Sequence, residues 1–140
     1  MGNPPIFPII YNCESADVIL IMNNPISIDE VPQSARAILD RVNTLSFNSS
    51  LMREMRAIKF VNHLVDSGFN DAGRLKKIRI HCIDAEDKMK NLGVSSKLNA
   101  QPEFIEWLFQ LGRERGDSFL ERHFDKIGHE ASTSIEERFL

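Results

Sequence analysis

The feature that most constrains the fold is an apolar run of five residues, Val18–Met22, that does not alternate with polar residues. A half-exposed antiparallel strand alternates apolar and polar side chains. A continuous run rich in β-branched residues is instead typical of a parallel strand covered by helices on both faces. The run is far too short to cross a bilayer, which takes about 20 apolar residues. It therefore predicts a buried strand in an α/β fold.

A second strand is predicted at residues 76–84, where side chains alternate. The apolar positions and the polar positions between them are Ile78, Ile80 and Cys82 and then Lys77, Arg79 and His81. This period of two predicts a strand with one face on a core and the other in solvent. Because a long helical pattern lies between the two strands, a right-handed βαβ crossover is the expected arrangement.

The connection between the two strands carries two helical registers. The first is formed by Ala35, Ile38, Val42 and Leu45. The second runs from residue 51 to Gly68, and only the polar triplet at 48–50 separates the two. One helix of about 35 residues and two helices joined at the triplet both fit the pattern, and the usual length of helices favours a break.

Helix-start and helix-stop residues place the remaining elements. In chain order we expect a short helix at 6–11 after Asn3-Pro4-Pro5, a loop with one helical turn at 84–98, a helix from Pro102 to Gly112, a helix from Phe119 to Gly128, and a capped last turn at 133–136. The predicted fold class is α/β, predominantly helical, with one βαβ unit. The 140 residues fit a single domain, or a fragment of one, over residues 1–140.

Composition and charge narrow the function classes. Seventeen basic and twenty acidic residues leave a net charge of −3, so no overall field attracts nucleic acid. No basic start leads into an apolar signal segment, and Ile6 stands where a myristoylation pattern needs Ser or Thr. Cys13 and Cys82 adjoin apolar segments and are predicted to be buried free thiols. A reducing compartment, cytoplasmic by default, is the expected location.

No pattern of catalytic, metal-binding or cofactor-binding residues is found. Ser67-Gly68 and Ser95-Ser96 lack the two glycines of a Gly-x-Ser-x-Gly nucleophile turn. His81 and Cys82 are neighbours on a strand, so their side chains point to opposite faces and cannot meet. The histidines show no metal-ligand spacing and are interpreted as surface or half-buried residues: His63, His81, His123 and His129. No catalytic residue, metal or cofactor is therefore predicted.

Three charged clusters are interpreted as solvated surface rather than as binding sites. They are Arg74, Lys76, Lys77 and Arg79, then Arg53, Arg56 and Lys59, and finally Asp84, Glu86 and Asp87. The first cluster suits phosphate or an anionic membrane, but cations on a strand edge also discourage aggregation. The second lies on one helix face. The acidic cluster follows a strand's carboxyl end, where α/β proteins often hold ligands, yet a charged loop accounts for it.

Several segments together resemble the C-terminal part of bacterial patatin-like phospholipases. They are Gly2-Asn-Pro-Pro-Ile-Phe-Pro8, Asn24-Pro25, Val31-Pro32 with Ala35-Arg36, Arg41-Val-Asn43, Ser46-Phe-Asn48, Leu51-Met-Arg-Glu-Met-Arg-Ala57, Ser95-Ser-Lys-Leu-Asn-Ala100 and Leu111-Gly-Arg113. The resemblance covers nearly the whole chain, and segments in this order are more specific than any single short motif. It implies a piece of a three-layer fold with a central, mostly parallel sheet between helices.

The resemblance also implies a function for the parent enzyme. Members of that family are lipid acyl hydrolases with a Ser–Asp dyad, whose serine lies in Gly-x-Ser-x-Gly and whose aspartate lies in Asp-Gly-Gly or Asp-Gly-Ala. In relatives of this kind that aspartate stands a few residues before the element matching Asn3-Pro4-Pro5. No catalytic residue can therefore be carried over to this chain. We expect a structural portion that is inactive alone and that pairs with the upstream catalytic half or with itself.

The strand pattern supports the expectation of a missing partner. Val18–Met22 needs cover on two faces, and only one other strand is predicted to neighbour it. Burying each of these side chains is worth about 1.5–3 kcal/mol, a large amount for a small domain. The alternative function is a non-catalytic interaction module, in which apolar faces around Met52, Met55 and Trp107, with nearby arginines, bind a partner protein or an anionic membrane.

Overall fold

The computed structural model describes residues 5–69 and 71–140 of the chain and is mixed α/β and largely helical. Its elements, in chain order, are α1 (Phe7–Asn12), β1 (Asp17–Met22), α2 (Ala35–Asp66), β2 (Arg79–Asp84), α3 (Glu86–Met89), the 3-10 turn η1 (Val94–Leu98), α4 (Pro102–His123), the 3-10 turn η2 (Phe124–Lys126) and α5 (Ile135–Phe139). Asn3 and Pro4 of the predicted helix start lie outside the described residues. No helix of the described part is long and apolar enough to span a membrane.

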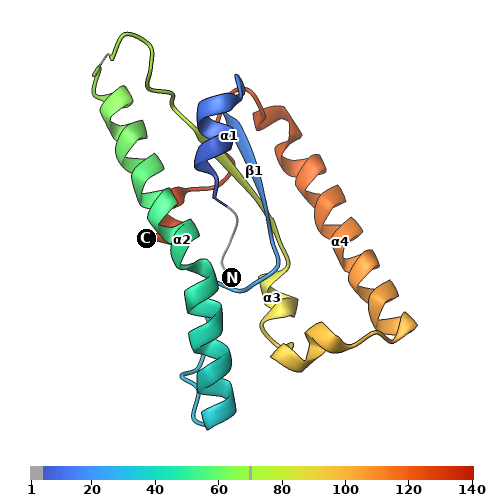
Figure 1. The fold of residues 1–140 in the computed structure, drawn as a ribbon. Coiled ribbons are helices and arrows are strands. Elements are labelled where there is room, and N and C mark those ends of the chain that lie inside the picture. The colour runs from blue at the N-terminus through green and yellow to red at the C-terminus, as the bar shows by residue number, and fades with distance from the viewer. Residues whose placement is uncertain (1–4, 70) are drawn as a thin grey trace.

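The two strands pair in parallel, as the helical connection between them requires. The register runs from Asp17 opposite Arg79 to Met22 opposite Asp84. Figure 1 shows α2 and α4 on opposite sides of this strand pair. The predicted parallel pair joined through a long helix is therefore confirmed.

The main core lies between the strands and α2, and α5 closes it. Met55 of α2 and Ile80 of β2 are almost fully buried there. Around them pack Ile6, Val18, Leu51, Ile58, Ile78, Ile135 and Phe139. The α2 positions recur at intervals of three and four, so the predicted helical period places one stripe of the helix on the sheet.

The break predicted at residues 48–50 is wrong, because α2 is continuous over its 32 residues. The polar side chains there find partners without leaving the helix. Asn48 is buried, and its amide nitrogen donates to the carbonyl of Pro25 at 3.2 Å. The hydroxyl of Ser49 donates to the carbonyl of Ser46 at 2.8 Å. A hydroxyl that bonds back to the preceding turn is compatible with a helix interior.

The helix end predicted at Gly112 is also wrong, because α4 continues to His123. Gly112 keeps an ordinary negative φ, whereas Gly68 and Gly128 adopt left-handed values of +85° and +87°. A glycine inside a helix costs only about 1 kcal/mol, which tertiary packing of the buried Leu111 and Phe119 offsets. Gly68 and Gly128 end their helical segments as predicted.

β1 was predicted to be covered on both faces and β2 on one face, and the structure shows the opposite. On β1, Ile19 is 45% exposed and Ile21 is 74% exposed, so only one face of this strand is covered by the described chain. On β2, the predicted solvent face is covered, and His81 has no exposed surface. The reason is that α4 packs over β2 rather than over β1, with the ring of Phe119 edge-on to His81 at 6.2 Å.

The short elements near the end of the chain follow the pattern with small shifts. The loop and helical turn predicted at 84–98 correspond to α3 and η1. The last helix is capped by the Ser134 hydroxyl, which accepts from the Glu137 amide at 3.3 Å. The capping pair thus lies one residue later than the predicted pattern at 133–136.

Candidate functional site

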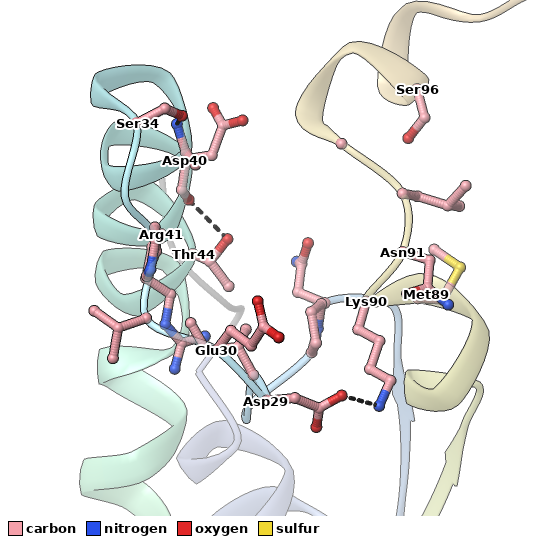
Figure 2. A pocket seen from close by; sticks show the side chains of 18 of the residues that line it. Asp29, Glu30, Ser34, Asp40, Arg41, Thr44, Met89, Lys90, Asn91 and Ser96 are labelled. Carbon is pink, nitrogen blue, oxygen red and sulfur yellow. Dashed lines mark hydrogen bonds and ion pairs between the residues drawn. The ribbon is translucent and has the colours of Figure 1, made fainter.

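A cavity of about 840 Å³ lies at the carboxyl ends of β1 and β2. It is formed by the loop that follows β1, by the first turns of α2, and by the segment after α3 (Figure 2). In open parallel sheets, ligand groups bind outside the carboxyl ends of the strands. This cavity is therefore the first candidate site, and it lies beside the acidic cluster noted in the sequence.

Glu86 lies beside the cavity, and its carboxylate holds the loop after β1 that forms part of the cavity wall. One oxygen accepts from the amides of Ile26 at 2.6 Å and Ser27 at 2.8 Å. The other pairs with Arg138 at 2.6 Å. Burial alone raises the pKa of Glu86, but the two amides and the guanidinium outweigh it, so the pKa lies below its ordinary value. The charged Glu86 side chain thus connects the loop after β1 to Arg138 of α5.

The other two members of the acidic cluster are also ion-paired. Asp84 accepts from Arg138 at 3.1 Å, so this arginine bridges Asp84 and Glu86. Asp87 pairs with Arg115 of α4 at 2.8 Å. The interpretation of the cluster as a charged loop is refined accordingly, because all three carboxylates have arginine partners within the chain.

The cavity wall carries side chains of both charges. Figure 2 shows Glu30 and Asp40 beside the opening and the pair formed by Asp29 and Lys90 at 2.6 Å below it. Arg41 donates through Nη2 to the Ile26 carbonyl at 2.9 Å. Its Nη1 is buried without a hydrogen-bond partner in the described structure. The lining includes the hydroxyl groups of Ser34, Thr44 and Ser96 and no histidine or cysteine.

A second group of functional side chains surrounds His81, on the opposite face of the sheet from α2. The Nδ1 atom of His81 lies 2.9 Å from the Ser132 hydroxyl, and its Nε2 atom lies 3.1 Å from the Asp17 carboxylate. Asp17 also accepts from Arg79 at 2.8 and 2.7 Å and from the Gly128 amide at 3.1 Å. The hydrogen bonds from Arg79 hold the pKa of Asp17 well below its ordinary value.

This order of groups, serine to histidine to aspartate, is that of a general-base relay. Three features assign it a structural role instead. His81 is fully buried, Asp17 is committed to Arg79, and Ser132 lines none of the cavities described for this structure. Both ring nitrogens of a buried imidazole need hydrogen-bond partners, and the Asp17 carboxylate and the Ser132 hydroxyl supply them. The network ties β1, β2 and the segment before α5 together.

The outer edge of β1 is the third feature with binding capacity. In a parallel ladder, the backbone groups of alternate residues point to opposite edges. Because the Arg79 amide donates to the Ala16 carbonyl, those of Ile19 and Ile21 point away from β2. In the described part of the chain, no strand pairs with this edge. The outer edge of β2 is occupied, since Thr133 donates to the Ile80 carbonyl at 3.1 Å.

A groove of about 390 Å³ runs along the open edge of β1, which we call the β1 groove. Its lining contains no charged side chain and consists of Pro5, Ile6 and Ile9, residues 18–24, and Phe47, Asn48 and Leu51. Unpaired backbone donors and acceptors beside an apolar groove are the features that accept an added strand.

The serine and cysteine candidates of the sequence are dispersed. The Ser67 hydroxyl donates to the Leu64 carbonyl, and Ser96 lines the large cavity, whereas the side chain of Ser95 lies outside the described part. Cys13 is exposed, so the prediction of a buried thiol is wrong there. Cys82 is partly buried, and burial raises its pKa. The structure brings none of these residues together with a histidine.

The histidines do not form a site. His63 and His129 are exposed, as predicted for surface residues. His123 is half-buried, and burial lowers its pKa together with nearby cations. The prediction fails for His81, which is fully buried because α4 covers it. Sequence reasoning also missed Ser132 and Asp17, because only the fold brings them to His81.

The cationic run is only partly the solvated edge that was predicted. Lys77 pairs with Asp66 at 2.6 Å and Arg74 with Asp71 at 2.6 Å, both at the surface. Arg79, however, is largely enclosed in its pair with Asp17, with 24% of its side chain exposed. Lys76 donates to the carbonyls of Cys13, Ser15 and Ile10. These two side chains therefore fasten the start of the sheet.

The second basic cluster and the two methionines beside it lie on α2, whereas Trp107 lies on α4. Arg53 and Arg56 are exposed as predicted, and Lys59 pairs with Glu136 at 2.9 Å. Met55 is fully buried in the core, so it cannot contact a partner. Trp107 is 41% exposed and stacks on Phe104 of the same helix.

Two further searches bear on function. The described part of the chain holds no group of three or more His, Cys, Asp or Glu residues arranged to bind a metal ion. No protein-family model, no curated protein and no solved structure matches the chain.

Proposed function

We propose that this chain is the C-terminal structural portion of a patatin-like lipid acyl hydrolase. Under this proposal, the serine and aspartate that hydrolyse the ester belong to a preceding part of the parent enzyme. The present chain extends the central sheet, supports the loop that carries the catalytic aspartate, and contributes to the wall around the acyl site. By itself it does not hydrolyse esters.

The open edge of β1 is the observation that carries the proposal. An internal strand of a parallel sheet has neighbours on both edges and helices on both faces. β1 has the continuous apolar sequence of such a strand from Val18 to Met22, yet Ile21 is 74% exposed, and its backbone groups point to an edge with which no strand of the described residues pairs. Covering Ile21 fully is worth about 1–2 kcal/mol. A sheet that continues past β1 provides that cover.

The resemblance to patatin-like enzymes supports the same assignment through particular segments. Asn24-Pro25 and Ser96-Lys97 both line the large cavity, and Lys97 lies 3.4 Å from the Asn24 side chain. Segments that are distant in sequence and matched by the resemblance thus meet at the carboxyl ends of the strands. That is the end of an α/β sheet where an acyl or headgroup site is expected.

The proposal is tested by assaying the purified chain with a short-chain nitrophenyl ester. We expect no serine-dependent turnover, because under the proposal the catalytic serine and aspartate belong to the preceding part of the parent enzyme. The Ser132→Ala variant is the matched control, since Ser132 is the serine hydrogen-bonded to a histidine. Turnover that this variant abolishes would contradict the proposal and would identify the His81 network as catalytic.

The parentage is tested by the genomic DNA immediately upstream of the codon for Met1. We expect a reading frame, continuous or split, that encodes Gly-x-Ser-x-Gly and Asp-Gly-Gly or Asp-Gly-Ala segments. Co-expression of that product with the present chain should yield a complex with esterase activity. A frame that encodes an unrelated protein would refute the parentage while leaving the structural description intact.

A further inference from the structure

Within residues 5–69 and 71–140, the outer edge of β1 is where a second polypeptide can continue the sheet. No strand of this described part pairs with the backbone groups of Ile19 and Ile21 along that edge. The corresponding edge of β2 is closed by Thr133, whose hydroxyl also accepts from the Cys82 amide at 3.0 Å. An added strand must therefore join at β1 and lie in the β1 groove.

The β1 groove lacks the features by which natural sheets prevent edge pairing. Lysines, inward-pointing charges, prolines and bulges within an edge strand discourage it. The segment from Val18 to Met22 has none of these residues, and no charged side chain lines the groove. Each chain carries a net charge of −3, so two copies repel each other weakly overall. Because no charged side chain lines the β1 groove, two copies that meet there bury no charged group.

We infer that two copies of this chain pair in antiparallel orientation through the outer edges of β1, which joins their strand pairs into one continuous sheet. A two-fold axis at Leu20 places Ile19 of one copy opposite Ile21 of the second copy, and the reverse. Each such hydrogen-bonded pair exchanges two N–H···O bonds. The register also places Asp17 opposite Asn23 of the second copy, so no two acids face each other.

A second copy is the occupant that the observations favour. An isologous interface needs a surface that complements itself, and a strand that is apolar throughout complements itself in either direction. The interface places Ile19 and Ile21, which are 45% and 74% exposed, beside their counterparts from the second copy on one face of the joined sheet. This inference does not rest on the proposed function, in which a strand of the parent enzyme occupies the same edge.

The mass of the full chain in solution is the first test. Light scattering after gel filtration, over a wide range of chain concentrations, should approach twice the 16.0 kDa of one chain. The Ile21→Lys variant places a charge on the paired edge and should raise the dissociation constant at least about tenfold. Leu39→Lys is the matched control, because Leu39 is 60% exposed on α2 and does not line the groove.

Disulfide trapping tests the register. In a Cys13→Ser background, Ile19→Cys and Ile21→Cys chains should crosslink strongly when mixed and weakly when each is oxidised alone. Both positions are exposed, so the substitutions leave the core intact. A monomer at all concentrations, a dimer that Ile21→Lys leaves intact, or preferential crosslinking of Ile19→Cys to itself would each overturn the inference. None of these results alters the esterase and genomic tests of the proposed function.

Discussion

Replacing Asp17 by Asn tests whether the His81 network holds the sheet to the C-terminal segment. The substitution keeps the side-chain shape but removes the charge that Arg79 contacts through two nitrogens at 2.8 and 2.7 Å. The side-chain NH2 group of the new Asn is itself a donor, so it offers no acceptor to the Arg79, His81 or Gly128 group that it faces. Neutralising one carboxylate therefore weakens contacts that join β1, β2 and the segment before α5.

The magnitude follows from the enclosure of the ion pair. Hydrogen bonds to charged groups contribute about 1.5–3 kcal/mol, and breaking a fully buried pair costs about 3–5 kcal/mol. The Asp17 side chain is 12% exposed and that of Arg79 is 24% exposed, so water screens part of the loss. We expect Asp17→Asn to lower the free energy of unfolding by about 2–3 kcal/mol near neutral pH.

The pH dependence provides a second readout. The hydrogen bonds from Arg79 lower the pKa of Asp17 in the folded chain below its ordinary value of 3.8. A lowered folded pKa means that the contribution is complete above the ordinary value and is lost as the pH falls below it. The difference between wild type and Asp17→Asn should be constant from about pH 5 to 8 and should shrink below about pH 4.

The assay is urea unfolding followed by circular dichroism, at one fixed chain concentration so that self-association contributes equally. Asp29→Asn is the control, because it makes the same chemical change in an exposed pair with Lys90, where Asp29 is 74% exposed. No measurable loss is expected for the control. A loss below about 1 kcal/mol for Asp17→Asn, or a difference that persists undiminished at low pH, would refute the structural role of the network.

Three further predictions concern the core, the cavity loop and the surface. Met55→Ala should lower the free energy of unfolding by about 2–5 kcal/mol, and Met52→Ala by less, because Met55 is fully buried and Met52 only partly; urea titration measures both. Glu86→Gln should release the loop after β1, seen as faster hydrogen exchange of the two loop amides and earlier proteolysis there, with unchanged exchange in α2 as the control. Sedimentation with anionic vesicles should show no salt-dependent binding, and binding that high salt releases would support the interaction module instead.

The sequence predicted correctly those elements of the fold that depend on the pattern of neighbouring residues. The continuous run at 18–22 and the alternation at 76–84 identified both strands, and the helical connection identified their parallel pairing. Gly68 and Gly128 ended helical segments because both adopt a left-handed φ. Gly112 carried the same local signal but keeps a helical φ, because the packing of α4 rather than the residue type decides there.

The parts that did not follow depend on contacts between distant residues. Asp17 and His81 are 64 residues apart, and His81 and Ser132 are 51 residues apart. No spacing rule links them, so a histidine on an alternating strand was assigned to solvent. The sequence indicated only the acidic cluster beside the cavity and did not predict the cavity itself. Its walls come from distant segments that only the tertiary fold brings together.

The two strands differ in how their side chains obtain cover, and their sequences explain the difference. The polar residues of β2 have partners within the chain, since Arg79 and His81 both bind Asp17. The apolar residues of β1 need only a surface, and on one face the described chain does not provide it. Apolar side chains do not specify which segment covers them, whereas the backbone groups of an open strand edge can pair with another strand. That asymmetry is why we propose β1, rather than β2, as the edge at which a catalytic half or a second copy joins.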